Sequence, residues 1–147
     1  MSWEMWTVTG YGIDVSEAGP GKTIKFIKKH LENTGYYKKI LKEVFEDANN
    51  TAEIYDGLCE CTDQYAAGEL IAEIIRNETG IPVYSTGINE DCKEAVLYPE
   101  KYPWEMTEEE KALTEDELHQ VFERYARELE EEEKPLFIGE QKLYFCG

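Results

Sequence analysis

The sequence predicts an α+β domain, with a mixed or antiparallel sheet of four to five strands packed by about four helices. Two apolar patterns indicate this class. One is strict alternation near the N-terminus, and the other is a set of stripes at spacings of three and four residues. A length of 147 residues and an apolar fraction of 41% suit one domain with its own core. We therefore expect residues 1–147 to form a single domain.

Residues 3–15 alternate as a long strand does, with aromatic side chains on both faces. One face carries Trp3, Met5, Thr7, Thr9, Tyr11, Ile13 and Val15, and the other carries Trp6 and Val8. Because a tryptophan lies on each face, we expect this strand inside the sheet rather than at its edge. Gly10 and Gly12 predict a bend or bulge midway.

The segment 16–23, SEAGPGKT, is similar to a phosphate-binding loop. Gly21, Lys22 and Thr23 match the end of that motif, and a strand before and a helix after are the right context. Ser16 replaces the first glycine of the motif, and no apolar strand ending in Asp follows to hold magnesium. We therefore favour an ordinary loop that enters a helix.

Two helices, 23–33 and 36–48, are predicted to form a basic hairpin over residues 22–48. The window 22–42 has seven lysines and one glutamate, which gives it a local charge of +6. Because the net charge of the whole chain is −17, the remaining residues carry −23. We favour packing of this hairpin beside acidic parts of the same fold. The alternative is a site for a nucleotide-like signalling molecule, with candidate residues Lys22, Thr23, Lys25, Lys28 and Lys29.

The middle of the chain predicts a buried helix from residue 63 to 78, stopped before Gly80. A strand over 81–86 and a second over 93–98 then form a hairpin, and Pro82 predicts that the start of the first strand lies at an edge or before its pairing begins. Near the C-terminus we expect two short strands, 136–138 and 142–146, joined by a turn at 139–141.

Residues 98–133 form an acidic turn and helix. Thr107 is predicted to cap a short turn, and Thr114 with Glu117 forms a capping box at the start of the clearest helix. The helix has an apolar stripe of Leu118, Val121, Phe122, Tyr125, Ala126 and Leu129. Trp104, with Tyr98 and Tyr102 nearby, is either a core residue, which we favour, or an interface anchor.

Fourteen acidic residues and four basic ones lie between Glu100 and Glu133, which gives this segment a net charge of −10. A solvated face is the usual meaning of such a run. The sharper hypothesis is a surface that binds a basic partner. Its predicted members are Glu108, Glu109, Glu110, Glu115, Asp116, Glu123, Glu130 and Glu131.

The net charge of −17 disfavours direct binding to nucleic acid or to an anionic membrane. No apolar run approaches membrane-spanning length, and the start MSWEMW lacks the features of a signal peptide, so we expect a cytoplasmic protein. The oligomeric state is not predicted.

Metal binding and catalysis are not favoured by the sequence, and we expect no cofactor. Cys59, Cys61, Cys92 and Cys146 do not have a usual zinc spacing. His119 has Glu115 and Glu123 one turn away on either side, which is part of a possible metal site, but a solvent-facing stripe is the better interpretation. With two histidines in the chain, no nucleophile–base arrangement can be assembled.

The strings SWEMWTVTGYGIDV and YPWEMTEEEKALTEDEL resemble small acidic proteins of bacteriophages and prophages of Firmicutes. The resemblance implies an accessory role in a bacterial host cell, and no functional residue is carried over with it. By analogy with anti-CRISPR proteins that imitate nucleic acid, the leading hypothesis is a non-enzymatic inhibitor of host defence whose acidic face occupies a basic groove of a nucleic-acid-handling protein. The alternatives are a sponge for a nucleotide-like signal and a structural phage accessory protein.

Overall fold

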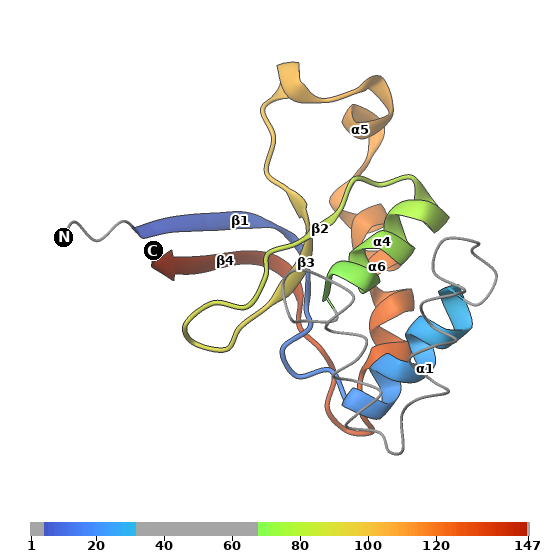
Figure 1. Cartoon of the computed structure of the whole chain (residues 1–147). Coiled ribbons are helices and arrows are strands. Elements are labelled where there is room, and N and C mark those ends of the chain that lie inside the picture. Colours follow the sequence, from blue (N-terminus) through green and yellow to red (C-terminus); the bar gives the residue numbers. More distant parts are fainter. Residues whose placement is uncertain (1–4, 32–67, 147) are drawn as a thin grey trace.

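The computed structural model describes residues 5–31 and 68–146, which form the α+β fold that the sequence predicts (Figure 1). The order of elements is β1 (Met5–Asp14), α1 (Pro20–Leu31), α4 (Gly68–Thr79), β2 (Tyr84–Ser85), β3 (Ala95–Pro99), η1 (Pro103–Glu105), α5 (Glu108–Ala112), α6 (Glu115–Leu129) and β4 (Ile138–Cys146). The four strands make one antiparallel sheet in the order β2-β3-β1-β4. The predicted helix 36–48 lies outside the described residues.

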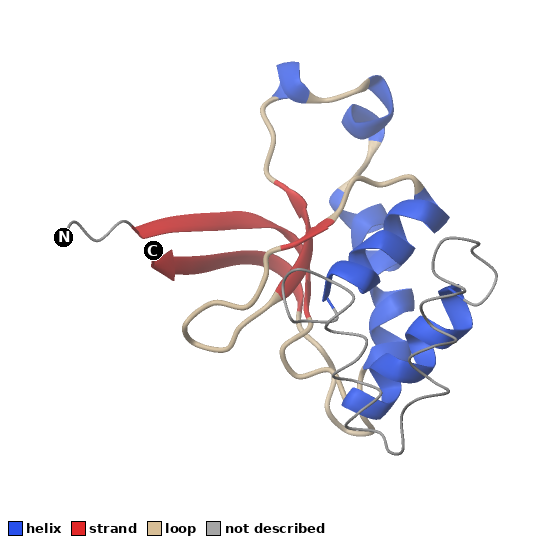
Figure 2. Cartoon of the chain, viewed as in Figure 1, coloured by secondary structure: helices blue, strands red, loops and turns tan. Residues whose placement is uncertain are grey.

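Strand β1 is an inner strand, as its two apolar faces predict. It pairs with β4 from Met5 to Ile13 and with β3 only from Gly10 to Asp14. Its first half therefore forms a two-stranded ribbon with β4 that projects from the body of the molecule (Figure 2). A Cβ atom on Gly12 would lie 2.1 Å from the carbonyl oxygen of Val96, so this position requires glycine. The pairing continues through both glycines, and the strand bends there without a bulge.

The C-terminal prediction of two short strands was wrong. Residues 138–146 form the single strand β4, and Gly139 pairs with Gly12 instead of making a turn. The local Gly-Glu-Gln sequence resembles a turn, but nine consecutive pairs with β1 decide the conformation. Strand β2 is shorter than the predicted 81–86, with only Tyr84 and Ser85 paired. It lies at an edge, and Pro82 comes before its pairing begins, so both alternatives for Pro82 hold.

Helices α1, α4 and α6 cover one face of the sheet, and the main core lies between them and the strands (Figure 1). Most described residues of the apolar stripes on these helices are buried, including Ile24, Ile27, Leu70, Ile74 and Phe122, while Val121 of the α6 stripe is partly buried. Because side chains alternate along a strand, Val96 and Tyr98 of β3 face the helices while Leu97 faces away. Leu97 joins a second, smaller cluster with Ala95, Leu143 and Phe145.

The capping box predicted at Thr114 is present, and Thr107, which was predicted to cap a short turn, forms a second one. The Thr107 hydroxyl accepts a hydrogen bond from the Glu110 amide, and the Thr114 hydroxyl accepts one from the Glu117 amide. Each glutamate carboxylate reaches back to the cap amide, so two amides are satisfied at each helix start. Helix α1 begins at Pro20, three residues before the predicted start, because proline suits the first helical position.

Candidate partner-binding surface

Residues 100–113 form an arm that leaves the sheet after β3, carries the short helices η1 and α5, and returns to α6 (Figure 1). A buried carboxylate, that of Glu110, fixes the end of the arm nearest the sheet. The Tyr98 hydroxyl donates a hydrogen bond of 2.6 Å to Glu110 Oε2, and Lys101 Nζ donates one of 2.7 Å to the same atom. These hydrogen bonds join β3, the segment that contains Lys101 and helix α5, so the arm is held in one position.

The pKa values of Glu110 and Tyr98 agree with these hydrogen bonds. Hydrogen bonds from Lys101 and then from Tyr98 lower the pKa of Glu110 to about 2, in spite of its burial. Burial, together with the hydrogen bond to Glu110, raises the pKa of Tyr98 to about 12. The group is therefore an ionised carboxylate held by an ammonium and a neutral phenol. The prediction that Glu110 faces a partner was wrong. Glu110 is only 7% exposed, and its carboxylate accepts hydrogen bonds from Tyr98 and Lys101 within the fold.

The tip of the arm displays an aromatic pair. Tyr102 is 62% exposed and Trp104 is 78% exposed, and their rings stack with centroids 4.7 Å apart and planes 2° apart. The favoured interpretation of Trp104 as a core residue was therefore wrong. Pro103 starts the turn between the two rings, and the Tyr102 amide donates a hydrogen bond to the Glu105 carboxylate. This local bonding points both rings to solvent.

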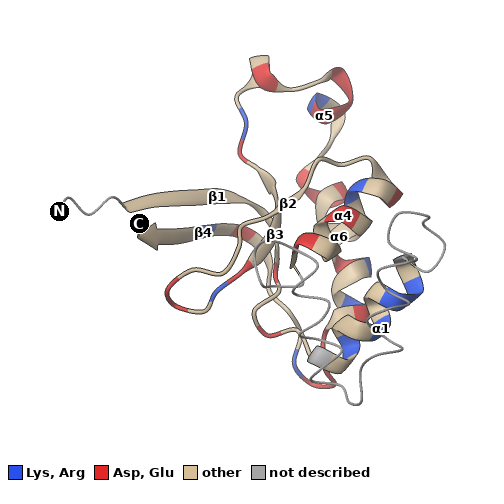
Figure 3. Ribbon diagram, viewed as in Figure 1, with Lys and Arg blue, Asp and Glu red and all other residues tan. Residues whose placement is uncertain are grey.

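Acidic residues lie on both short helices of the arm (Figure 3). Glu105, Glu108 and Glu109 are exposed. The two lysines of the arm do not offset them fully, because Lys101 is bound to Glu110 and Lys111 lies 3.3 Å from Glu108. The arm therefore presents an aromatic pair in a negative environment.

The first turn of α6 continues the negative surface toward β4. Glu115 and Asp116 are exposed, and both interact electrostatically with the hydroxyl of Tyr11 in β1. The pKa of Tyr11 is raised by burial and then by Glu115, Asp116 and Glu140. The Tyr11 hydroxyl lies 2.8 Å from His119 Nδ1, so this histidine is engaged with the sheet. We call Glu105, Glu108, Glu109, Glu115, Asp116 and Glu140 the acidic arm surface.

A cavity of about 490 Å³ adjoins this surface, between the strands and the arm. Its walls include Tyr11, Tyr98, Lys101, Met106 and Glu140. The cavity therefore has both aromatic and charged walls, and both signs of charge are present.

The other predicted acidic residues serve the fold or lie elsewhere. Glu123 pairs with Arg127 at 2.8 Å, and the Glu130 carboxylate accepts a hydrogen bond from the Leu136 amide. Glu130 and Glu131 line a depression together with Lys22 of α1, at the C-terminal end of α6. A helix of 15 residues spans about 22 Å. Apart from Glu123, which lies midway along α6, the predicted acidic residues thus fall into two groups at opposite ends of this helix rather than on one face.

The basic helix α1 packs beside the acidic helix α6, as we favoured from the sequence. Lys29 Nζ lies 2.5 Å from Glu128 Oε1, and Lys22 shares the depression at the end of α6. Thr23 is buried and its hydroxyl donates to the Gly19 carbonyl, so it does not face a ligand. Lys25 and Lys28 are exposed. Helix α1 therefore offers lysines without the threonine hydroxyl that a phosphate-binding loop uses.

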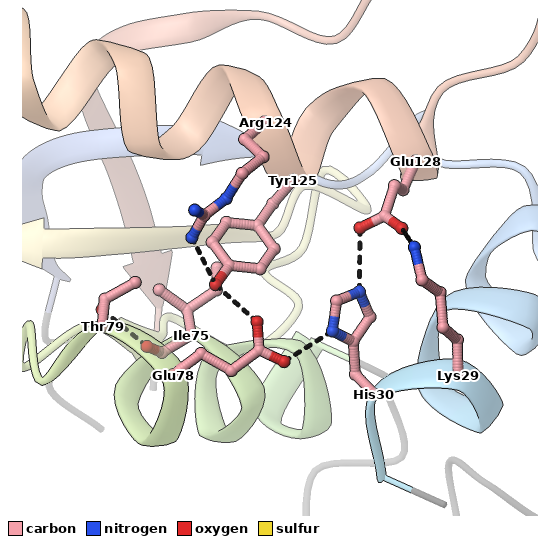
Figure 4. A network of polar contacts seen from close by, with 8 residues as sticks. All are labelled: Lys29, His30, Ile75, Glu78, Thr79, Arg124, Tyr125 and Glu128. Atoms are coloured by element: carbon pink, nitrogen blue, oxygen red, sulfur yellow. Dashed lines mark hydrogen bonds and ion pairs between the residues drawn. The ribbon is translucent and has the colours of Figure 1, made fainter.

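His30 joins three helices at the end of α1 (Figure 4). Its Nδ1 lies 2.5 Å from Glu78 of α4, and its Nε2 lies 2.8 Å from Glu128 of α6. Glu78 also accepts a hydrogen bond from the Tyr125 hydroxyl, which itself accepts one from Arg124. Burial, with the bond to Glu78, raises the pKa of Tyr125 to about 12. Each polar group has a partner, and the network fastens α1, α4 and α6.

Within the described residues, no three His, Cys, Asp or Glu side chains are placed to hold a metal ion, and no helix is both long and apolar enough to cross a membrane. Cys92 and Cys146 are free thiols, whereas Cys59 and Cys61 lie outside the described part. The chain matches no protein-family model, no curated protein and no solved structure.

Proposed function

We propose that this chain is a non-enzymatic binding protein whose acidic arm surface occupies a basic groove of a nucleic-acid-handling protein. One observation carries the proposal. Glu109, Glu115 and Asp116 are exposed and lack an ion-pair partner among the described residues, whereas the nearby lysines are engaged by the fold's own carboxylates. Unpaired like charges on neighbouring elements repel one another, so a cationic partner would stabilise them.

The setting of the proposal comes from the resemblance to small acidic phage proteins, which suggests a host defence protein as the target. A groove that normally tracks phosphates has the positive potential that such a surface complements. Association would be steered by charge, and would be fast at low ionic strength and weak at high ionic strength. The alternative, a nucleotide-like ligand at α1, has less support because Thr23 is buried and Lys29 is paired with Glu128.

The test is a pull-down from nuclease-treated bacterial lysate with the tagged full chain, eluted with a salt ramp. A triple charge reversal, Glu109→Lys, Glu115→Lys and Asp116→Lys, is compared with Glu17→Lys, Asp91→Lys and Glu132→Lys, which makes the same change in net charge at exposed positions elsewhere.

We expect the chain to retain a nucleic-acid-binding protein that added nucleic acid displaces. Only the arm reversal should abolish this retention. Equal retention by the two triple variants, or retention of no protein by the unaltered chain, would overturn the proposal.

A further inference from the structure

We propose that the stacked Tyr102–Trp104 pair is the docking point for an arginine side chain of the partner. In this arrangement the guanidinium lies on the free face of the Trp104 indole and contacts the carboxylates beside it. The inference rests on the proposed function and names the chemistry of the group that the arm recognises.

The aromatic pair has no role in the core that would explain it. Trp104 is the most exposed large apolar residue of the described chain, and Tyr102 is also more than half exposed. Their rings stack on each other, and because Trp104 is 78% exposed, the outer face of its indole is open to solvent. Tryptophan and tyrosine are the residue types that most often dominate the energy of protein interfaces.

The pair is also held in place before any partner arrives. Pro103 and the Tyr102–Glu105 hydrogen bond fix the turn, and the Thr107 capping box fixes the next one. The buried Glu110 anchors both to β3. A side chain that is already ordered loses little entropy on binding, so the interaction energy of the ring contributes more fully to affinity.

The surrounding charge selects the occupant. Glu105, Glu108 and Glu109 are exposed on the same arm as the rings, and Lys101 and Lys111 are engaged by carboxylates. A cation is attracted both by the face of an indole and by these carboxylates. Guanidinium suits the site better than ammonium, because it is planar and weakly hydrated, stacks on aromatic faces and forms paired bonds with carboxylates.

The test uses two peptides of equal length and charge, one alternating Arg and Gly and the other alternating Lys and Gly. Affinity of each for the full chain is measured by titration calorimetry at low and at moderate salt. The variants are Trp104→Ala, the conservative Trp104→Phe, and Trp6→Ala as a control at another exposed tryptophan. Because Trp104 is a surface residue, its replacement leaves the fold intact, and circular dichroism verifies this for each variant.

We expect the arginine peptide to bind roughly threefold to thirtyfold more tightly than the lysine peptide, the range that a cation–π contact supplies. Trp104→Ala should remove the preference, Trp104→Phe should keep part of it, and Trp6→Ala should leave it unchanged. Equal affinities for the two peptides, or a preference that survives Trp104→Ala, would overturn the inference.

The two proposals fail in different ways. If charge reversal on the arm abolishes retention of the lysate protein, but the unaltered chain binds both peptides equally, the proposed function stands and the arginine site is refuted. A chain that prefers the arginine peptide through Trp104, yet retains no lysate protein, supports the site and refutes the proposed function.

Discussion

At the scale of single residues, the most constrained carboxylate of the arm is one that a partner cannot reach. Glu110 is buried, accepts hydrogen bonds from Tyr98 and Lys101, and completes the capping box of α5 through the Thr107 amide. These three hydrogen bonds of its side chain, together with the one that its backbone amide donates to the Thr107 hydroxyl, define where the arm begins. Its loss leaves a lysine and a phenol without their acceptor.

We predict that Glu110→Gln lowers the free energy of unfolding by about 1–3 kcal/mol at pH 7, because an amide is a weaker acceptor than a carboxylate. The pKa of Glu110 is depressed to about 2 in the folded state, from an ordinary 4.5. Its contribution is therefore complete above pH 4.5 and is lost as the pH falls toward 2. Urea unfolding across this range should show the two proteins converging in stability.

The matched control for this prediction is Glu109→Gln, which removes the neighbouring exposed carboxylate. It should change stability by less than about 0.5 kcal/mol. A stability difference between the unaltered protein and Glu110→Gln that stayed constant down to pH 2 would contradict the assigned ionisation.

At the scale of elements, helix α4 meets strand β3 through a glycine and a buried carboxylate. Glu94 is 7% exposed, accepts a hydrogen bond from the Ser85 hydroxyl, and also accepts one from the Gly68 amide at the start of the helix. Burial raises the pKa of Glu94, and these hydrogen bonds oppose the increase. A Cβ atom on Gly68 would lie 2.5 Å from the Glu94 carboxylate, so the close approach depends on glycine.

We predict that Gly68→Ala destabilises the protein by about 1–3 kcal/mol, although alanine is the better helix former, because the new methyl group overlaps Glu94. The double variant Gly68→Ala, Glu94→Ala should cost less than the sum of the two single changes, since the overlap is then absent. Chemical denaturation of the four proteins measures this coupling.

Gly21→Ala in α1 is the comparison for this cycle, because nothing lies within 4 Å of a Cβ at that position. Its effect should lie between zero and a gain of about 1 kcal/mol. If Gly68→Ala were as well tolerated as Gly21→Ala, the contact between α4 and β3 would not be as close as described.

At the scale of the whole molecule, charge is distributed so that the basic helix and part of the acidic helix offset each other. Lys29 and His30 of α1 bind Glu128 of α6, and this pairing brings together segments about a hundred positions apart in the chain. The acidic arm surface lies at the other end of α6, and among the described residues only its Glu108 forms an ion pair, with Lys111. The excess of negative charge over the whole chain remains −17.

We predict that stability rises with salt, because screening weakens the self-repulsion of a chain with this net charge. The midpoint of urea unfolding should increase between roughly 0.02 M and 0.5 M sodium chloride, over which the Debye length falls from more than 20 Å to about 4 Å. The same midpoint in sucrose of equal osmolality separates screening from general exclusion effects. A midpoint that fell with sodium chloride would show that attractive ion pairs outweigh the repulsion.

The sequence by itself determined the features that depend on neighbours along the chain. The caps at Thr107 and Thr114, the apolar stripe of α6 and the inner position of β1 follow from residue types at fixed spacings, because a helix or strand turns a spacing into a face. The favoured packing of the basic segment against acidic parts of the fold was likewise an inference from local charge.

Only the tertiary structure decided which side chains of the acidic segment are available. Glu109 and Glu110 are adjacent and chemically identical, yet one is exposed and the other is bound to Tyr98 and Lys101. Pro103 beside Trp104 was a signal that the aromatic residues sit on a turn, but their exposure depended on where the arm leaves the sheet. Gly139 joined a strand rather than a turn because β1 offered it a partner. Burial and pairing arise from contacts between distant segments, and local spacing does not encode those contacts.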